Sequence, residues 1–187
     1  MSDKPVPPRP GLGAQAARLD EMLRVDHAGE LAAVHIYRGQ RAVMNTARGK
    51  DRIAWQLQEM EAHEAAHLAR FDEILTERRV RPTLLAPVWR LAGFTLGAAT
   101  ALMGEKAAHA CTEAVETVIE DHYARQITEI GEKEPGLVAE LTQFREDELA
   151  HRDSALAEGA REAVGYPLLS AVIQAGCRAA IKISEKI

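Results

Sequence analysis

The stretch that decides the fold runs from residue 57 to residue 74 and reads LQEMEAHEAAHLARFDEI. Its apolar residues recur every three or four positions, which predicts one buried face of an α-helix. Glu64 and His67 lie on the same face, because residues three apart are neighbours on a helix. Burying an unpaired charge is costly, so these two ionisable side chains need a compensating partner.

The same pattern occurs a second time along the chain. Glu148 and His151 repeat the Glu-x-x-His spacing, and each such pair follows a helical stripe that carries a lone glutamate. Glu30 precedes Glu64 by 34 residues, and Glu116 precedes Glu148 by 32 residues. Two helical hairpins of similar length predict a four-helix bundle with approximate two-fold symmetry.

The remaining sequence fits the same all-α architecture, a ferritin-like bundle with two additional apolar or amphipathic helices. The Pro-rich residues 1–13 are expected to form a flexible tail, and residues 14–187 a single domain. Alternating β-branched residues are almost absent, so strands are not expected. Helices are expected over about 15–48, 51–79, 83–103, 105–130, 134–161 and 166–187.

Composition narrows the classes of function. The chain has 23 basic and 28 acidic side chains, a net charge of -5, which argues against a nucleic-acid partner. We expect no signal peptide, since the start lacks an apolar core. No uncharged apolar run reaches the ~18 residues of a membrane span. Cys111 and Cys177 are expected to be buried free thiols, which suits the reducing cytoplasm of a bacterium.

Metal ions are the compensating partner that best fits the ionisable stripes. Four glutamates supply four negative charges and two divalent ions supply four positive charges, so the buried site would be close to neutral. One glutamate from each of two helices, with Glu-x-x-His from each of the other two, is the ligand set of di-iron and di-manganese bundles. The ligand types alone suit iron and manganese equally. The predicted ligands are Glu30, Glu64, His67, Glu116, Glu148 and His151.

Three further polar residues lie on or beside these stripes. Asp26 lies one turn before Glu30, where it is expected to orient a ligand histidine. Tyr123 lies two turns after Glu116 and is expected to donate a hydrogen bond or to relay an electron or a proton. His122 lies slightly off the stripe, in a position for a capping or supporting role. Ordinary structural hydrogen bonding is the alternative for all three.

The same residues permit rival interpretations. His63, Glu64 and His67 match H-E-x-x-H, the zinc metalloprotease signature, but His63 falls with Gln56 and Arg70 on a polar helix face. A ferritin-like protein for iron storage or peroxide scavenging would use the same six ligands. A non-enzymatic helical module with buried ion pairs is a third alternative. A measurement of iron content would separate this module from any protein that uses the six residues as iron ligands.

Several segments resemble the demethoxyubiquinone hydroxylase family of ubiquinone biosynthesis, in its bacterial form. The most specific are VDHAGE at residues 25–30 and QAGCR at residues 174–178, and the resemblance extends from about Leu19 to the C-terminus. The family's ligand pattern maps onto all six predicted ligands. Thr117 stands where some relatives have a second glutamate beside the ligand, a departure that should not remove a ligand.

The resemblance implies a di-iron monooxygenase. Such an enzyme uses two iron ions and dioxygen to hydroxylate the ring of a demethoxy-ubiquinone or its quinol. It also implies NADH as the reductant, directly or through the substrate, and in some members a lipid-binding accessory protein.

A polyprenyl quinone or quinol as substrate places the enzyme at a membrane surface, here as a peripheral protein on the cytoplasmic face of the bacterial inner membrane. Residues 84–103 are apolar nearly all round, and residues 166–187 have one apolar and one basic face. Helices of this kind often lie in the membrane interface. The alternative is that both helices cover the core of the bundle.

Overall fold

The computed structural model describes residues 12–186, which contain six α-helices and two short 3-10 helices but no strand. The all-α prediction is therefore confirmed. The tail predicted for residues 1–13 falls mainly outside the described residues, and Leu12 and Gly13 already belong to the first helix. The elements are α1 (Leu12–Met44), α2 (Asp51–Arg78), α3 (Ala86–Leu102), α4 (Glu105–Ile130), η1 (Gly131–Lys133), α5 (Pro135–Ala157), η2 (Ala160–Glu162) and α6 (Tyr166–Ser184).

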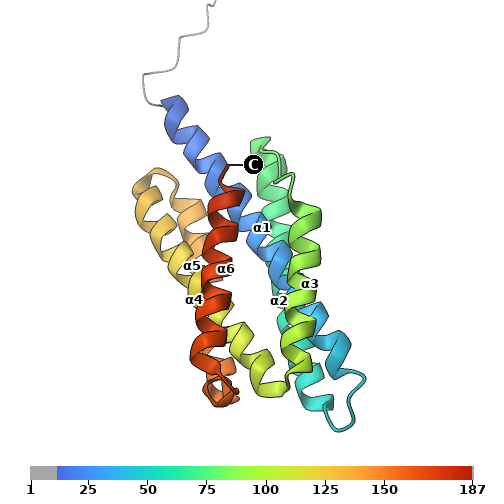
Figure 1. Ribbon diagram of the computed structural model, residues 1–187. Helices are drawn as coiled ribbons and strands as arrows, with labels where there is room; N and C mark the ends of the chain where they lie inside the picture. The colour runs from blue at the N-terminus through green and yellow to red at the C-terminus, as the bar shows by residue number, and fades with distance from the viewer. Residues whose placement is uncertain (1–11, 187) are drawn as a thin grey trace, which may run out of the picture.

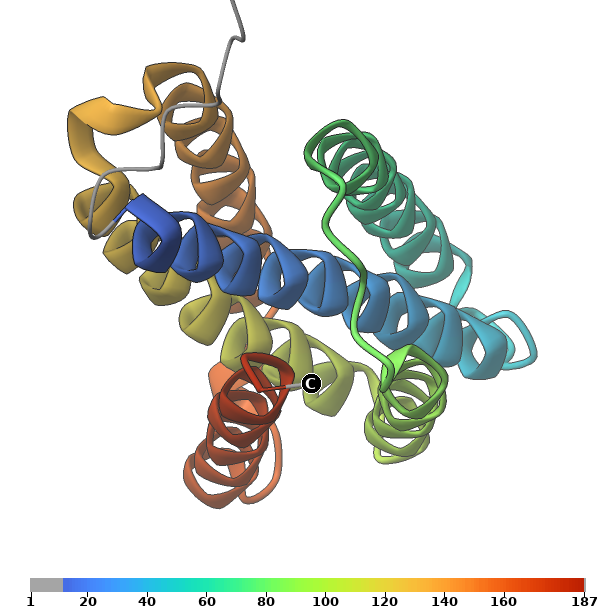
Figure 2. The same cartoon turned by 90° about the horizontal axis from the view of Figure 1, so that it is seen from above.

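Four of the helices form a ferritin-like bundle, and the other two flank it (Figure 1). Within the bundle α1 packs against α2 and α4 packs against α5, while α3 packs against α1 and α6 against α4. Figure 2 shows α2 and α5 on one side of α1 and α4, with α3 and α6 on the other side. The halves α1–α3 and α4–α6 therefore repeat one arrangement, as the two-fold pattern of the sequence predicts.

Two predicted helix ends lie too far along the chain. α1 ends at Met44 rather than at residue 48, because the Thr46 hydroxyl and amide both donate to the carbonyl of Val43, at 2.8 and 3.1 Å. Such local hydrogen bonds compete with the helical ladder. α5 ends at Ala157 rather than at residue 161, since the chain reverses at Gly159 with a φ of +89°. Glycine adopts this left-handed conformation without steric cost.

Glycines set the close approach of α3 to α1. A Cβ atom added to Gly93 would lie 2.6 Å from the carbonyl oxygen of Ala32, and one added to Gly97 would lie under 3.0 Å from that of Ile36. Real side chains do not tolerate such distances to backbone atoms. The two helices are therefore in backbone contact, which a side chain at either position would prevent.

Two apolar clusters fill the bundle on either side of its middle. One contains Leu23, Phe71 and Leu141, and the other contains Ile53 and Leu57. Both clusters combine residues from several helices, so they hold the helices at fixed separations around the layer between them. Burying side chains of this size contributes about 1.5–3 kcal/mol each.

The two cysteines are free thiols, but only Cys111 is fully buried, so the prediction was wrong for Cys177, which is partly buried. Burial raises the pKa of Cys111 to about 12 and that of Cys177 to about 11. Both thiols are therefore almost entirely protonated and weakly nucleophilic at neutral pH.

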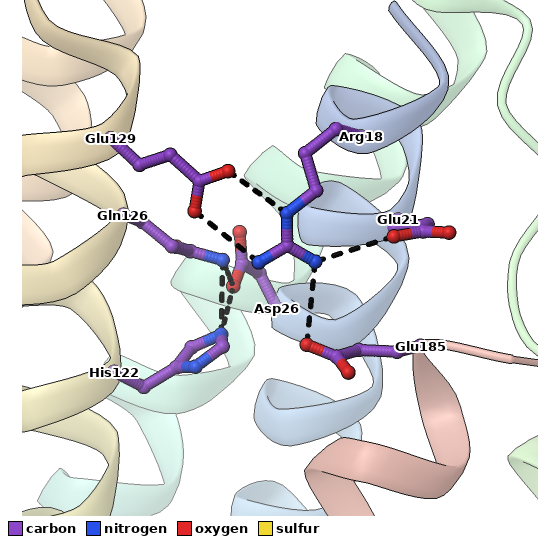
Figure 3. Close-up of polar contacts among 7 residues, drawn as sticks. All are labelled: Arg18, Glu21, Asp26, His122, Gln126, Glu129 and Glu185. Carbon is purple, nitrogen blue, oxygen red and sulfur yellow. Dashed lines mark hydrogen bonds and ion pairs between the residues drawn. The ribbon is translucent and has the colours of Figure 1, made fainter. Parts of the chain in front are cut away.

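A surface network joins the ends of three helices (Figure 3). The Arg18 guanidinium on α1 donates to Glu129 near the end of α4 at 3.0 Å and to Glu185 just after α6 at 3.4 Å. Ion pairs at this level of exposure stabilise a fold by about 0–1 kcal/mol, so the network fixes geometry more than stability. Among the described residues no helix is both long and apolar enough to cross a membrane.

We predict that Gly97→Ala lowers the stability of the protein by about 1–3 kcal/mol, because its methyl group forces α3 away from α1. Gly176→Ala is the matched control: Gly176 lies within α6 and an added Cβ would meet nothing within 4 Å. This control should be neutral or slightly stabilising, since alanine favours helices. Thermal unfolding measures both, and equal melting temperatures for the two variants would contradict the proposed close contact.

Candidate metal centre

The six predicted ligands come together in the layer between the apolar clusters. Each is at most 5% exposed. α1 supplies Glu30 and α4 supplies Glu116; the Glu-x-x-His pairs come from α2 and α5, where one face of each helix meets the interior. All four bundle helices therefore contribute to one site.

The six side chains form two overlapping groups. In each group, one candidate ligand atom per residue lies within 4.8 Å of the others. The first group is Glu30, Glu64, His67 and Glu148, and the second is Glu64, Glu116, Glu148 and His151. Glu64 and Glu148 belong to both groups. The six residues would therefore suit two neighbouring metal ions, with Glu64 and Glu148 available to both.

Unpartnered atoms at the centre of the site support this fit. The buried Nδ1 atoms of His67 and His151 make no hydrogen bond, and neither does either carboxylate oxygen of Glu148. The Nδ1 atom of His67 lies 3.3 Å from Oε1 of Glu148, and the Nδ1 atom of His151 lies 3.0 Å from Oε1 of Glu64. Neither contact has the geometry of a hydrogen bond. Buried polar atoms are normally satisfied, so a cluster of unsatisfied ones indicates a place for an ion.

The electrostatics of the site also favour cations. Burial raises the pKa values of Glu30 and Glu116 well above their usual range, and neighbouring carboxylates add to the rise. Burial would lower the pKa of His151, but Glu148 and Glu64 overcome it and raise that pKa to about 11. The buried carboxylates are therefore unfavourable as anions unless positive charge lies beside them. Metal ions binding at these atoms would supply that charge and displace any protons from the ligands.

Each lone glutamate accepts a hydrogen bond from a tyrosine of the opposite hairpin. Tyr123 on α4 donates to Oε1 of Glu30 on α1, and Tyr37 on α1 donates to Oε1 of Glu116 on α4 at 2.7 Å. Tyr123 thus donates a hydrogen bond, as the sequence suggested, whereas Tyr37 was missed. The repeat contained the signal, because each tyrosine follows its own helix's lone glutamate by seven residues.

The histidines are supported from the opposite hairpin in the same way. The Nε2 atom of His67 contacts Oδ2 of Asp147 at 3.2 Å, and the Nε2 atom of His151 contacts Nδ1 of His63 at 3.2 Å. Partners of this kind fix the orientation and tautomer of a ligand histidine. His63 and Asp147 each precede the Glu of a Glu-x-x-His pair, so they are equivalent positions in the repeat. His63 is exposed and belongs to neither ligand group. Its contact with His151 accounts for the histidine at this position, so the H-E-x-x-H match does not require a zinc site.

The prediction that Asp26 orients a ligand histidine was wrong. Its Oδ1 atom instead lies 3.2 Å from Nε2 of His122 and accepts a hydrogen bond from Gln126 at 2.7 Å (Figure 3). His122 therefore supports Asp26 rather than a ligand, and Gln126 completes the cluster. Periodicity places Asp26 on the inner face of α1, but it does not reveal which residue of α4 lies opposite.

A mainly apolar cavity adjoins the site. It has a volume of about 80 Å³ and lies between α1, α3, α4 and α6. Alanine, valine and isoleucine side chains form most of its wall. The ionisable or hydroxyl side chains that line it include Asp26, Glu30, His122 and Tyr123. The cavity therefore leads from the outside of the bundle to one edge of the candidate metal centre.

Comparison with known proteins agrees with this architecture. The model of the family described as ubiquinone biosynthesis protein COQ7 matches residues 17–184. The chain belongs to the COQ7 family. The matched region contains all six predicted ligands and both supporting tyrosines.

Relatives of the COQ7-family chain are similar over most of their length. The 3-demethoxyubiquinol 3-hydroxylase of Rhodospirillum rubrum is 49% identical over 95% of this chain and 82% of its own. The mitochondrial NADPH-dependent 3-demethoxyubiquinone 3-hydroxylase of Mus musculus is 47% identical over 91% and 78%. The mitochondrial 5-demethoxyubiquinone hydroxylase of Saccharomyces cerevisiae is 41% identical over 93% and 80%.

We predict that His67→Ala removes metal from the protein, whereas His63→Ala retains it with an affinity about 10–100-fold lower, the usual cost of losing a supporting partner. Metal content per chain after anaerobic loading with ferrous iron measures both. His35→Ala serves as a control, because His35 on α1 belongs to neither ligand group and its Nδ1 atom contacts the carbonyl of Leu31, at 2.8 Å. Equal loss of metal from His63→Ala and His67→Ala would instead favour a zinc site of the protease type.

Proposed function

We propose that this COQ7-family chain is a di-iron monooxygenase that hydroxylates the ring of a demethoxyubiquinol or demethoxyubiquinone in ubiquinone biosynthesis. The observation that carries the proposal is the pair of overlapping Glu/His groups in the middle of the bundle. Relatives named for this hydroxylation are 36–49% identical to the chain. None of these names favours the alternatives of iron storage, peroxide scavenging or proteolysis.

Iron is the proposed metal because the reaction needs a redox-active ion, which zinc is not. Glu30, Glu64, His67, Glu116, Glu148 and His151 would hold two such ions. Bound iron would supply the activation of dioxygen that carbon hydroxylation requires. NADH is the proposed source of the two electrons, directly or through the substrate.

The protein's own residues prepare this site in two ways. Tyr37 and Tyr123 hold the carboxylates of Glu116 and Glu30 by hydrogen bonds. The apolar clusters above and below the layer limit the access of water. Both effects keep the ligands in one arrangement, which matters because small displacements in a reactive site cost large factors in rate.

The cavity beside Glu30 is the proposed binding site of the quinol or quinone ring. Its mainly apolar wall suits an aromatic ring with a polyprenyl tail, and its few polar groups can fix the orientation of the ring. Since Glu30 and Tyr123 form part of that wall, a bound ring would lie beside the first ligand group.

The outer faces of α3 and α6 support a peripheral location on a membrane surface. The apolar face expected on α6 points away from the bundle, and so does much of α3. Exposed residues on these helices include Val88, Leu91, Leu168, Val172 and Ile183, and Leu84 just before α3 is exposed as well. Arg178 and Lys182 on α6, and Lys186 just after it, are also exposed. Helices that combine apolar and basic residues bind the interface of anionic membranes. We propose the cytoplasmic face of the bacterial inner membrane, with a lipid-binding accessory protein as a partner that presents the substrate.

We predict that Glu148→Ala loses its iron and its hydroxylase activity together, because Glu148 belongs to both ligand groups. The loss in turnover should exceed the roughly 10–100-fold that loss of a supporting partner costs. The measurements are iron per chain, oxygen uptake and hydroxylated product with a short-tail demethoxyubiquinol. Wild type should bind about two iron ions.

The control for this experiment is Glu146→Ala, which removes an exposed carboxylate two residues away on α5. It should retain both iron and activity. A wild-type protein that binds iron but produces no hydroxylated ring, with accessory protein and reductant present, would overturn the proposed reaction and leave the metal centre standing.

A further inference from the structure

Asp26 is a buried carboxylate in the wall of the cavity, outside both ligand groups. It is 4% exposed and lies on α1 one turn before Glu30. Four residues of helix rise about 6 Å, which is close to the width of a six-membered ring with its two oxygens. A ring that contacts Asp26 would therefore reach the edge of the metal centre at Glu30.

One oxygen of this carboxylate is fixed by the protein. Oδ1 accepts a hydrogen bond from Nε2 of Gln126 at 2.7 Å and contacts Nε2 of His122 at 3.2 Å (Figure 3). Gln126 and His122 also contact one another at 2.9 Å. Burial raises the pKa of Asp26, and the two nitrogen partners oppose that rise by stabilising the ionised form. The carboxylate is thus held in one orientation.

The other oxygen has no partner. Oδ2 of Asp26 is buried and makes no hydrogen bond with any described residue. Leaving a buried acceptor unsatisfied costs about 1–3 kcal/mol, so such an atom usually has a partner outside the protein chain. Because Asp26 lines the cavity, a ligand in the cavity is the natural source of the missing donor.

We propose that Oδ2 of Asp26 accepts a hydrogen bond from a ring hydroxyl of the substrate, so that the cavity selects the reduced quinol over the oxidised quinone. The inference rests on the proposed function and identifies the redox form of the ring that binds. A quinol hydroxyl can donate to a carboxylate oxygen that has no other donor. A quinone has carbonyl oxygens only, which would face the carboxylate without a donor between them.

The size of the preference follows from the same argument. A site built to accept a hydrogen bond from a hydroxyl discriminates against an analogue that lacks it, because the polar group of the protein is then left unpaired. We expect the quinol to bind at least on the order of tenfold more tightly than the quinone.

Binding of the two ring forms tests the proposal. The full chain is loaded with zinc, which has no redox chemistry, so that neither form is converted during the measurement. Dissociation constants of a short-tail demethoxyubiquinol and of its quinone are measured anaerobically by titration. Asp26→Asn replaces the free acceptor by an amide, and Asp121→Asn makes the same change on the exposed surface of α4.

The expected result is a preference for the quinol in wild type and in Asp121→Asn that falls to about onefold or inverts in Asp26→Asn. Asp26→Asn should keep the wild-type iron content, because Asp26 belongs to neither ligand group. Equal affinities of wild type for the two forms, or an unchanged preference in Asp26→Asn, would overturn the role of Asp26 while leaving the hydroxylase proposal intact. Failure of both forms to bind wild type would count against the hydroxylase proposal itself.

If Asp26→Asn does not fold, Asp26→Glu replaces it. This variant keeps the negative charge but moves the carboxylate by one methylene. The proposal expects weaker quinol binding with an unchanged quinone affinity; equal weakening of both would contradict it.

Discussion

The burial of four carboxylates and two imidazoles in one layer is the constraint on which the rest of the structure depends. These side chains are too polar to pack against one another without compensation, and they are long enough to hold facing helices apart. α1 packs closely with α2, and α4 with α5, while the ionisable layer lies between the two hairpins. The apolar clusters on either side close the bundle around this layer. The candidate metal centre is therefore part of the core and not an addition to it.

The two hairpins depend on each other for the order of this layer. Tyr123 reaches across to Glu30 and Tyr37 reaches across to Glu116. Asp147 contacts His67 of the other hairpin in the same reciprocal manner. Neither hairpin can orient its own ligands alone. Docking of the hairpins and formation of the site are consequently one event, as in other metalloproteins whose binding energy is also folding energy.

Helical periodicity was sufficient to find the six residues of the site, because burial of a charge leaves a visible interruption in an apolar stripe. It did not find Tyr37, although the seven-residue spacing shared with Tyr123 was present in the repeat. The assignment of Asp26 failed for a different reason: its partners His122 and Gln126 come from another helix, and a single sequence does not give the register between helices. The close packing of α3 against α1 could not be predicted either, because the spacing of glycines in a sequence does not show which other helix they contact.

The backbone contact between α1 and α3 has a mechanical consequence. Side chains between two helices can change rotamer and so absorb small movements, but at Gly93 and Gly97 the intervening side chains are missing. The two helices must shift as one rigid body. α3 carries an exposed apolar face, and α1 carries Asp26 and Glu30 in the wall of the cavity. A force applied to the outer surface of α3 is thus delivered directly to the wall of the cavity that we propose as the site of the ring.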